Sequence, residues 1–315
     1  MRHRLDCAFE ILPLGEPEHF ARINPDYNGN CPMLDTDGYC LLQKEQGEEA
    51  LPLICRVYPR SVKRYGDKTE ICMSNSCERT IELLIETTEP LRMQPVNIRL
   101  PFDGIKIYDA NDTKDFVRKE AIRLMENRAL PLCKRLENLC DFIGDPENSP
   151  VADNVHDCTG ASAIHAIRAF ILTIRQKSRS IGDCGGKALT LLGDCGDDEA
   201  YEKFKIAKQH LCNAFPHIED YAEKLIVNHM IFEGFPYIAD AGSPAVAFSS
   251  LLFSVALLRF ICVFGMMESH SLDDLVDLMA EAYRFVEHSG FYAITANRHL
   301  PDFQRTFYEL SPLLL

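Results

Sequence analysis

The sequence has a deficit of positive charge. Lysine and arginine total 33 against 47 aspartate and glutamate residues, which gives a net charge of −14. Because proteins bind nucleic acid by neutralising phosphates with a basic surface, this balance argues against nucleic acid as a partner. With 46% hydrophobic and 25% charged residues, the 315-residue chain has the composition of a soluble globular protein with one large or two ordinary domains.

Several segments typical of other protein classes are also missing. The chain opens at residues 1–7 without the apolar run of a secretory signal, so we expect a cytoplasmic protein with reduced thiols. No Gly-x-Gly-x-x-Gly motif follows an expected strand, and strands do not alternate with helices. A nucleotide-phosphate site and a doubly wound methyltransferase domain are therefore not expected.

One long apolar run, at residues 245–267, needs a separate interpretation. Arg259 lies well inside it, and a central arginine costs about 2.5–3.5 kcal/mol on membrane-insertion scales. Neither flank is basic. We therefore expect a buried core helix here and no stable membrane insertion.

Cysteine is abundant, with 13 residues, and unevenly spread. Six lie within the first 77 residues, whereas most of the other seven fall in apolar helical patterns, where cysteine behaves as a small hydrophobe. Cys31, Cys40, Cys55 and Cys77 are separated by 8, 14 and 21 intervening residues. Thiolates are soft ligands, so these four can converge on zinc or an iron cluster. Spacing alone leaves free structural thiols as an equal alternative.

Apolar periodicity predicts a mainly α protein with a small cysteine-rich loop and hairpin subdomain at residues 1–86. That subdomain is expected to contain a helix-turn-helix lead-in at 1–24, with its second helix at 18–23, a β-hairpin at 61–74 and a helix from Cys77 to about Glu86. A proline-containing connector follows at 87–111, and 112–315 is predicted as an all-α domain. Its expected helices span residues 113–128, 132–142, 161–177, 198–214, 220–234, 244–267 and 271–288.

The cysteine motif resembles a known family. The stretches Cys31–Leu34, Asp37–Cys40 and Cys55–Arg60 are similar to the flagellin lysine-N-methylase (FliB) family, and 222–229 and 282–289 resemble its helical region. The resemblance implies methyl transfer from S-adenosylmethionine to lysine side chains of flagellin. It also implies an iron–sulfur cluster, of the 4Fe–4S type if complete, with zinc as an alternative. The family's ligand positions match Cys31, Cys40, Cys55 and Cys77, and Cys72 has no clear counterpart.

The sequence differs from the family pattern at the N-terminus. Members of the family start with a further cysteine-rich segment that contains an adjacent Cys-Cys pair, whereas only Cys7 precedes Cys31 here. We therefore expect the chain to be shortened at its N-terminus. The departure motivates an alternative function, a non-enzymatic metal-binding protein or an inactive remnant of the same family.

Polar residues near these motifs are candidates for cofactor binding and catalysis. Arg56 and Arg60 flank the Cys55 loop and suit the carboxylate of a methionine-derived cofactor, with a solvated hairpin face as the alternative. Lysine methylation needs a neutral amine, so Tyr58 and Tyr237 are candidates to orient it.

Two histidines receive interpretations of their own. His229 is a further catalytic candidate, although it falls on an apolar face, where a core histidine bonded to a carbonyl is the default interpretation. His288 follows Glu287 and forms either an acid–base pair with it or a favourable charge at a helix C-terminus.

Overall fold

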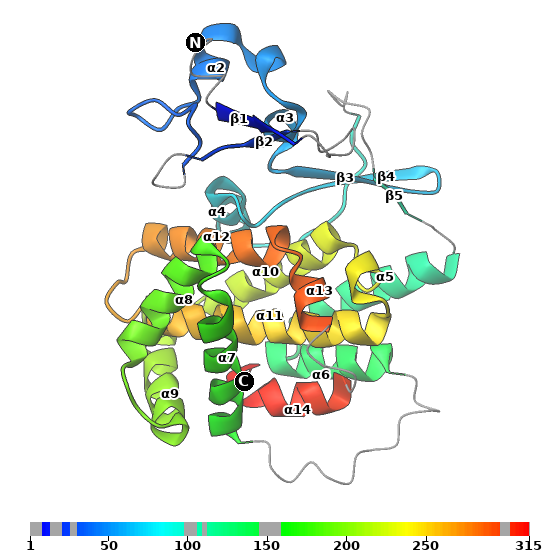
Figure 1. Ribbon diagram of the computed structural model, residues 1–315. Helices are drawn as coiled ribbons and strands as arrows, with labels where there is room; N and C mark the ends of the chain where they lie inside the picture. The colour runs from blue at the N-terminus through cyan, green and yellow to red at the C-terminus, as the bar shows by residue number, and fades with distance from the viewer. Residues whose placement is uncertain are drawn as a thin grey trace. The chain divides into compact units, whose positions relative to one another are not determined.

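The computed structural model describes residues 8–12, 21–25, 30–97, 106–108, 112–144, 159–296 and 303–314. Contacts divide the chain into two compact units. Unit 1 comprises residues 1–58 and 98–104, and unit 2 comprises residues 59–97 and 105–315. Helices dominate the chain, which confirms the predicted mainly α class (Figure 1).

Unit 1 is built from short elements around a small apolar core. In chain order they are β1 (Phe9–Ile11), β2 (Ala21–Ile23), α2 (Leu41–Gln46), the 3-10 turn η1 (Glu48–Ala50) and α3 (Leu53–Val57). The core consists of Ala8, Met33, Leu42 and Leu51, and Cys31 and Cys40 pack against it. The helical lead-in is wrong at 9–11 and 21–23, because these residues form the antiparallel strand pair of β1 and β2; residues 1–7 and 13–20 lie outside the described residues.

Unit 2 begins with a small sheet. Strands β3 (Arg60–Tyr65) and β4 (Lys68–Met73) form an antiparallel hairpin, in which Tyr65 lies opposite Lys68. Gly66 takes a φ of 61°, a left-handed conformation that glycine adopts without steric cost. Strand β5 (Lys106–Tyr108) pairs parallel to β3. The predicted hairpin at 61–74 is thus confirmed.

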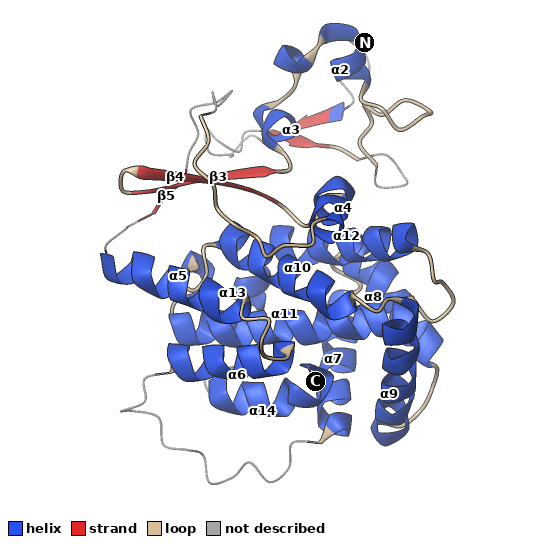
Figure 2. Cartoon of the chain, turned by 180° about the vertical axis from the view of Figure 1, so that it is seen from behind, coloured by secondary structure: helices blue, strands red, loops and turns tan. Residues whose placement is uncertain are grey.

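Helices form the body of unit 2 (Figure 2). They are α4 (Glu78–Glu86), α5 (Asp112–Met125), α6 (Leu132–Ile143), α7 (Gly160–Ile174), α8 (Arg179–Leu192), α9 (Asp197–Ala214), α10 (Ile218–Glu233), the 3-10 turn η3 (Ala239–Ala241), α11 (Pro244–Gly265), α12 (Leu272–His288), α13 (Phe291–Ala296) and α14 (Phe303–Leu314). The seven predicted helices and the one after Cys77 all form, with ends shifted by a few residues. Helices α8, α13 and α14 were not predicted.

The glycines of α8 explain why its sequence looks like a poor helix. Glycine lowers helix propensity, but a Cβ at Gly185 would come 3.0 Å from the side chain of Ile171 on α7. Close packing of α8 on α7 and α11 therefore compensates for the weak local preference.

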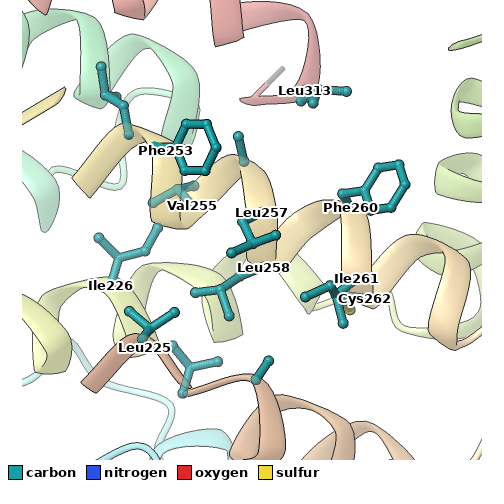
Figure 3. Close-up of a cluster of buried hydrophobic side chains, with 14 of the residues drawn as sticks. Leu225, Ile226, Phe253, Val255, Leu257, Leu258, Phe260, Ile261, Cys262 and Leu313 are labelled. Atoms are coloured by element: carbon teal, nitrogen blue, oxygen red, sulfur yellow. The ribbon is translucent and has the colours of Figure 1, made fainter. Parts of the chain in front are cut away.

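Helix α11 is the centre of the core (Figure 3). Ser243 caps its N-terminus by accepting a hydrogen bond from the Val246 amide, and Pro244 suits the first turn. Seven of the described helices of unit 2 pack against it: α6, α7, α8, α9, α12, α13 and α14. Among the described residues it is the one helix long and apolar enough to cross a membrane, and 89% of its most apolar window is buried inside the protein. The predicted core helix is thus observed.

Helix α4 packs on α10 and α12, and β4 contacts α10. Ile81 and Leu84 of α4 are buried in the same apolar core as those two helices. The hairpin and α4 therefore pack with the helical body, whereas the expected division at residue 86 grouped them with the cysteine-rich segment.

Candidate functional site

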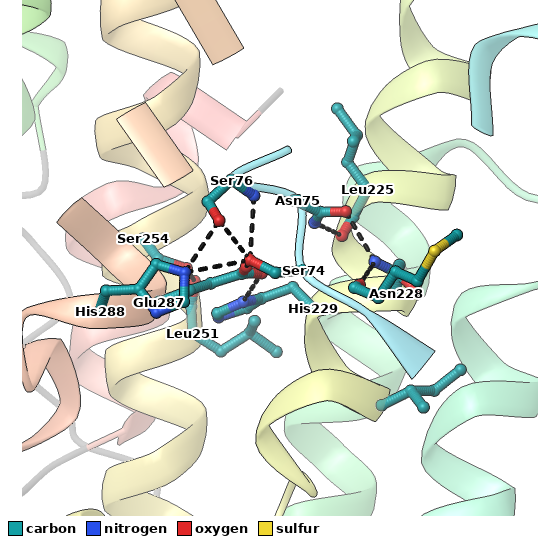
Figure 4. Close-up of polar contacts among 12 residues, drawn as sticks. Ser74, Asn75, Ser76, Leu225, Asn228, His229, Leu251, Ser254, Glu287 and His288 are labelled. Atoms are coloured by element: carbon teal, nitrogen blue, oxygen red, sulfur yellow. Dashed lines mark hydrogen bonds and ion pairs between the residues drawn. The ribbon is translucent and has the colours of Figure 1, made fainter. Parts of the chain in front are cut away.

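The turn between β4 and α4 is polar and fully buried. Ser74, Asn75 and Ser76 have at most 1% of their surface exposed. Buried polar groups need hydrogen-bond partners, so a turn of this composition must be matched by polar groups on the helices around it. The partners come from α10 and α12 of the same unit (Figure 4).

Glu287 near the end of α12 is the centre of these contacts. Ser74 Oγ donates to Glu287 Oε2 at 2.5 Å and lies 2.6 Å from Ser76 Oγ. Ser76 Oγ in turn lies 2.8 Å from Nε2 of His288. The last turn of α12 is thereby joined to the turn that follows β4.

His229 of α10 reaches the other oxygen of the same carboxylate. Its Nδ1 lies 3.0 Å from Glu287 Oε1, and its Nε2 lies 2.9 Å from the Tyr292 hydroxyl. His229 is 1% exposed and the side chain of Glu287 is completely buried. We refer to Ser74, Ser76, His229, Glu287, His288 and Tyr292 together as the Glu287 network.

Proton positions in the Glu287 network follow from its donors. An ionised carboxylate only accepts, so Nδ1 of His229 carries a proton; in the neutral imidazole, Nε2 then accepts from the Tyr292 hydroxyl. The Ser74 hydroxyl donates its one proton to Glu287, so the Ser76 hydroxyl donates to Ser74 Oγ. His288 Nε2 then donates to Ser76, which places the lone pair of a neutral His288 on Nδ1.

Two asparagines hold the turn against α10. Asn228 Nδ2 donates to the Asn75 side-chain oxygen and to the Met73 carbonyl, each at 2.7 Å. Asn75 Nδ2 donates to the Leu225 carbonyl at 2.9 Å. These bonds fix the backbone that presents Ser74 and Ser76, so the network has a rigid support.

Burial sets the charge state at both ends of the Glu287 network. Desolvation raises the pKa of Tyr292 well above its ordinary value, and nearby Glu233 and Glu287 raise it further, so the phenol is neutral. Desolvation lowers the pKa of His288; Glu287 opposes this shift and Arg284 adds to it. His288 is therefore neutral at pH 7, while the residue as a whole is exposed. The network connects a neutral base at the surface to a carboxylate inside.

The cysteines predicted to bind metal fall in both units. Cys31, Cys40 and Cys55 belong to unit 1, and Cys77 precedes α4 in unit 2. Desolvation raises the pKa of Cys55, and the charges of Cys31 and Cys40 raise it further, so these three sulfurs lie within electrostatic range. No group of three His, Cys, Asp or Glu residues among those described is arranged to hold a metal ion. The three thiols are gathered, but they do not form a preformed site.

Cys72 lies on β4 of unit 2, where burial raises its pKa to about 11. It is therefore a thiol at neutral pH.

The predicted cofactor residues also lie on either side of the boundary between the units. Arg56 belongs to α3 in unit 1, and its buried Nε has no hydrogen-bond partner within the described chain. Arg60 is exposed at the start of β3 in unit 2. Lys63, from the same basic stretch, is buried instead and donates to the Ile231 carbonyl at 3.1 Å.

Of the three predicted catalytic candidates, one belongs to the Glu287 network. His229 is buried as expected, but its expected carbonyl partner is wrong, because it bonds to a carboxylate and a phenol. Tyr58 is 42% exposed beside α3, and Tyr237 is half-buried with the Lys114 ammonium 5.4 Å from its ring centre. Sequence reasoning missed the roles of Ser74, Ser76 and Tyr292. The available signal was the position of the two serines directly before Cys77, an expected metal ligand.

Comparison with known proteins gives distant relatives. No family model and no solved structure matches the chain. An 89-residue stretch is 28% identical to the lysine-N-methylases of Salmonella typhimurium and Salmonella choleraesuis, and covers 28% of this chain and 22% of each relative. The chain is a distant relative of these lysine-N-methylases.

A second relative supports the same relationship. The flagellar biosynthetic protein FliU of Salmonella muenchen is 29% identical over 84 residues, which cover 26% of this chain and 50% of the relative. The chain thus spans half or less of the length of the curated relatives it matches. The relationship to lysine-N-methylases suggests a methyltransferase.

Proposed function

We propose that the protein is a lysine N-methyltransferase that uses S-adenosylmethionine and modifies lysine side chains of flagellin. The similarity to the two lysine-N-methylases carries this proposal. The matching cysteine motif and the relative involved in flagellar biosynthesis support it.

The chemistry requires a base. S-adenosylmethionine supplies an electrophilic methyl group when bound. The nitrogen of the lysine must be neutral to form the new N–C bond, while the methyl–sulfur bond breaks and its electron pair stays on sulfur. A lysine ammonium therefore has to lose a proton first, and that proton needs an acceptor close to neutrality.

His288 is the residue of the Glu287 network suited to accept this proton. It is neutral at pH 7, and its lone pair is on Nδ1. A proton taken up at Nδ1 leaves Nε2–H donating to Ser76, and through Ser74 the positive ring is linked to the Glu287 carboxylate. We assign His288 as the base and Ser74, Ser76 and Glu287 as its positioning residues.

Arg56 fits the cofactor's carboxylate. Its buried Nε has no partner within the described chain, and an unpaired buried donor is costly unless a ligand satisfies it. A bidentate contact between the guanidinium and a carboxylate is the strong form of that interaction.

The activity is tested by incubating the protein, reconstituted with iron and sulfide, with flagellin and S-adenosylmethionine. Intact-protein mass spectrometry is expected to show flagellin gaining one methylene mass per methyl group, and peptide mapping is expected to place it on lysine. A Salmonella lysine-N-methylase serves as positive control. No gain in mass from this protein, while the control methylates the same flagellin, contradicts the proposal.

Replacing His288 with glutamine is expected to lower kcat at pH 7 about a hundredfold, because positioned general bases contribute on that scale. Activity is expected to recover as the pH rises, since more of the lysine is then neutral in solution. The measurement is the initial methylation rate as a function of pH. His270→Gln, an exposed histidine in the same unit, is the matched control. An H288Q enzyme with the rate and pH profile of the control would rule out the assigned base.

The second candidate function is non-enzymatic metal binding. The gathering of Cys31, Cys40 and Cys55 in unit 1 favours it. Here too we propose Cys31, Cys40, Cys55 and Cys77 as ligands of an iron–sulfur cluster or zinc. Because the thiols are not arranged as a preformed site, binding has to draw them together and release their protons.

Anaerobic reconstitution tests this ligand set. The native chain is expected to retain iron and sulfide, or zinc, after desalting, and Cys55→Ala is expected to lose most of it. Elemental analysis and visible absorption are the measurements. Cys133→Ala, on α6 of unit 2, is the control that keeps the metal. Equal metal content in the two variants would remove Cys55 from the ligand set. A native chain that binds metal but methylates nothing supports the second function.

A further inference from the structure

A cavity in unit 2 lies apart from the side chains assigned to methyl transfer. It has a volume of about 70 Å³, is partly open to the surface, and is lined by side chains of α4, α6, α9, α10, α11 and α12. Most of its wall is aliphatic, including Ile81, Leu211, Leu225, Val255, Leu258 and Met279. Figure 3 shows Leu225, Val255 and Leu258 in the apolar layer between α10 and α11. The aliphatic part of this wall suits an apolar chain.

Charged groups of opposite sign gather in the same lining, with cations in excess. Arg259 on α11 is paired with Glu219 of α10 and donates to the Leu314 carbonyl at 3.1 Å. Lys208 on α9 is half-buried, and it makes no hydrogen bond or ion pair with any described residue. Desolvation lowers the pKa of Lys208, Arg259 lowers it further, and Glu219 opposes the shift. Burial of an unpaired ammonium is unfavourable, so an anion at this position is stabilising.

We propose that this cavity binds a short aliphatic carboxylate, with the hydrocarbon chain between α9, α10 and α11 and the carboxylate at Lys208. The cavity is roughly half the size of an apolar cavity that binds benzene, and far below the 300–1,000 Å³ or so of drug-sized ligand sites. Its size therefore selects a short chain. The uncompensated ammonium selects an anionic head group.

Butanoate is the probe, with butanol and butylamine as matched ligands of the same chain length. Ligand-observed NMR titration of the full chain measures the dissociation constants. Butanoate is expected to bind at least tenfold more tightly than the other two, because a hydrogen bond to a charged group adds affinity that an alcohol lacks and an amine is repelled. From propanoate upward, affinity is expected to rise about threefold to fourfold per methylene until the cavity is filled.

Two variants separate the head group from the chain. Lys208→Met keeps the aliphatic stem and is expected to weaken butanoate binding at least tenfold while leaving butanol binding unchanged. Lys205→Met, an exposed lysine on α9 that is paired with Glu202, is the control. Ala222→Leu inserts a larger side chain into the cavity wall and is expected to weaken binding of every ligand of the series.

Thermal unfolding of each variant verifies that it is folded. Equal affinity for butanoate and butanol overturns the proposed head-group contact, and so does a Lys208→Met variant that binds butanoate like the native chain. No effect of Ala222→Leu, in a folded protein, overturns the placement of the chain. Absence of butanoate binding at every concentration of the titration overturns the proposal as a whole. Because none of these readouts involves methylation, their failure is independent of the proposed enzymatic function.

Discussion

Replacing Glu287 with glutamine is expected to destabilise the protein by about 3 kcal/mol and to reduce its methylation activity. Ser74 and His229 each donate a proton to one oxygen of this buried carboxylate. Glutamine keeps the shape but offers one oxygen and one NH₂ group, so one buried donor faces another donor. An unsatisfied buried donor costs about 1–3 kcal/mol, and the lost charge adds to that cost.

Urea unfolding measures the change in the free energy of unfolding, and Glu281→Gln is the matched control. Glu281 lies on the same helix and pairs with Arg284 at the surface, where an ion pair is worth at most about 1 kcal/mol. If the two variants have the same stability, the carboxyl of Glu287 is not the ionised acceptor assigned here.

A double mutant tests the contact itself. Ser74→Ala removes one of the two donors, so in the pair Ser74→Ala, Glu287→Gln the amide NH₂ no longer opposes a hydroxyl. The combined destabilisation is expected to be smaller than the sum of the single changes. Additive effects would mean that the two side chains do not interact in solution.

Replacing Glu223 with alanine is expected to destabilise unit 2 by about 3–5 kcal/mol, the cost of breaking a buried ion pair from one side. Glu223 is 1% exposed. It accepts from Arg135 Nη1 at 2.5 Å and from Arg128 Nη2 at 2.8 Å. Arg135 is itself buried, so loss of the carboxylate leaves a cation without its counter-charge. Chemical denaturation is the measurement.

Two further variants define the origin of that loss. Glu82→Ala removes an exposed carboxylate paired with Arg79 and is expected to cost less than about 1 kcal/mol. Replacing all three members of the buried cluster together, as Arg128→Met, Arg135→Met and Glu223→Leu, is expected to recover most of the lost stability, because no charge remains buried. If Glu223→Ala is as mild as Glu82→Ala, the ion pair contributes little to stability.

The secondary structure was largely predictable because it depends on local patterns. The apolar spacing of α12 and the continuous apolar run of α11 each indicate their helices directly. The prediction failed where tertiary contacts outweigh local preference. In α8, close packing of Gly185 on Ile171 supports a helix that its glycines disfavour, and at 21–23 pairing with β1 selects a strand.

The candidate site was predictable only in part. The isolated apolar position of His229 indicated burial, yet its partners, Glu287 and Tyr292, lie on other elements. Lys63 belongs to a basic stretch that suggests a solvent-exposed face. Side chains of a strand alternate between two faces, however, and the side chain of Lys63 lies on the buried face of β3. Packing against α10 decides which face is buried, and the sequence of β3 alone carries no information about that contact.

The sequence by itself determined the mainly α class, the hairpin, the buried central helix and the resemblance of the cysteine motif, because periodicity and residue spacing are properties of short stretches. Only the tertiary structure decided which polar groups meet. Ser74 and Glu287 are 213 residues apart in the chain, and burial makes their hydrogen bond obligatory once β4 and α12 come together. Folding of the helical body turns these distant side chains into one network.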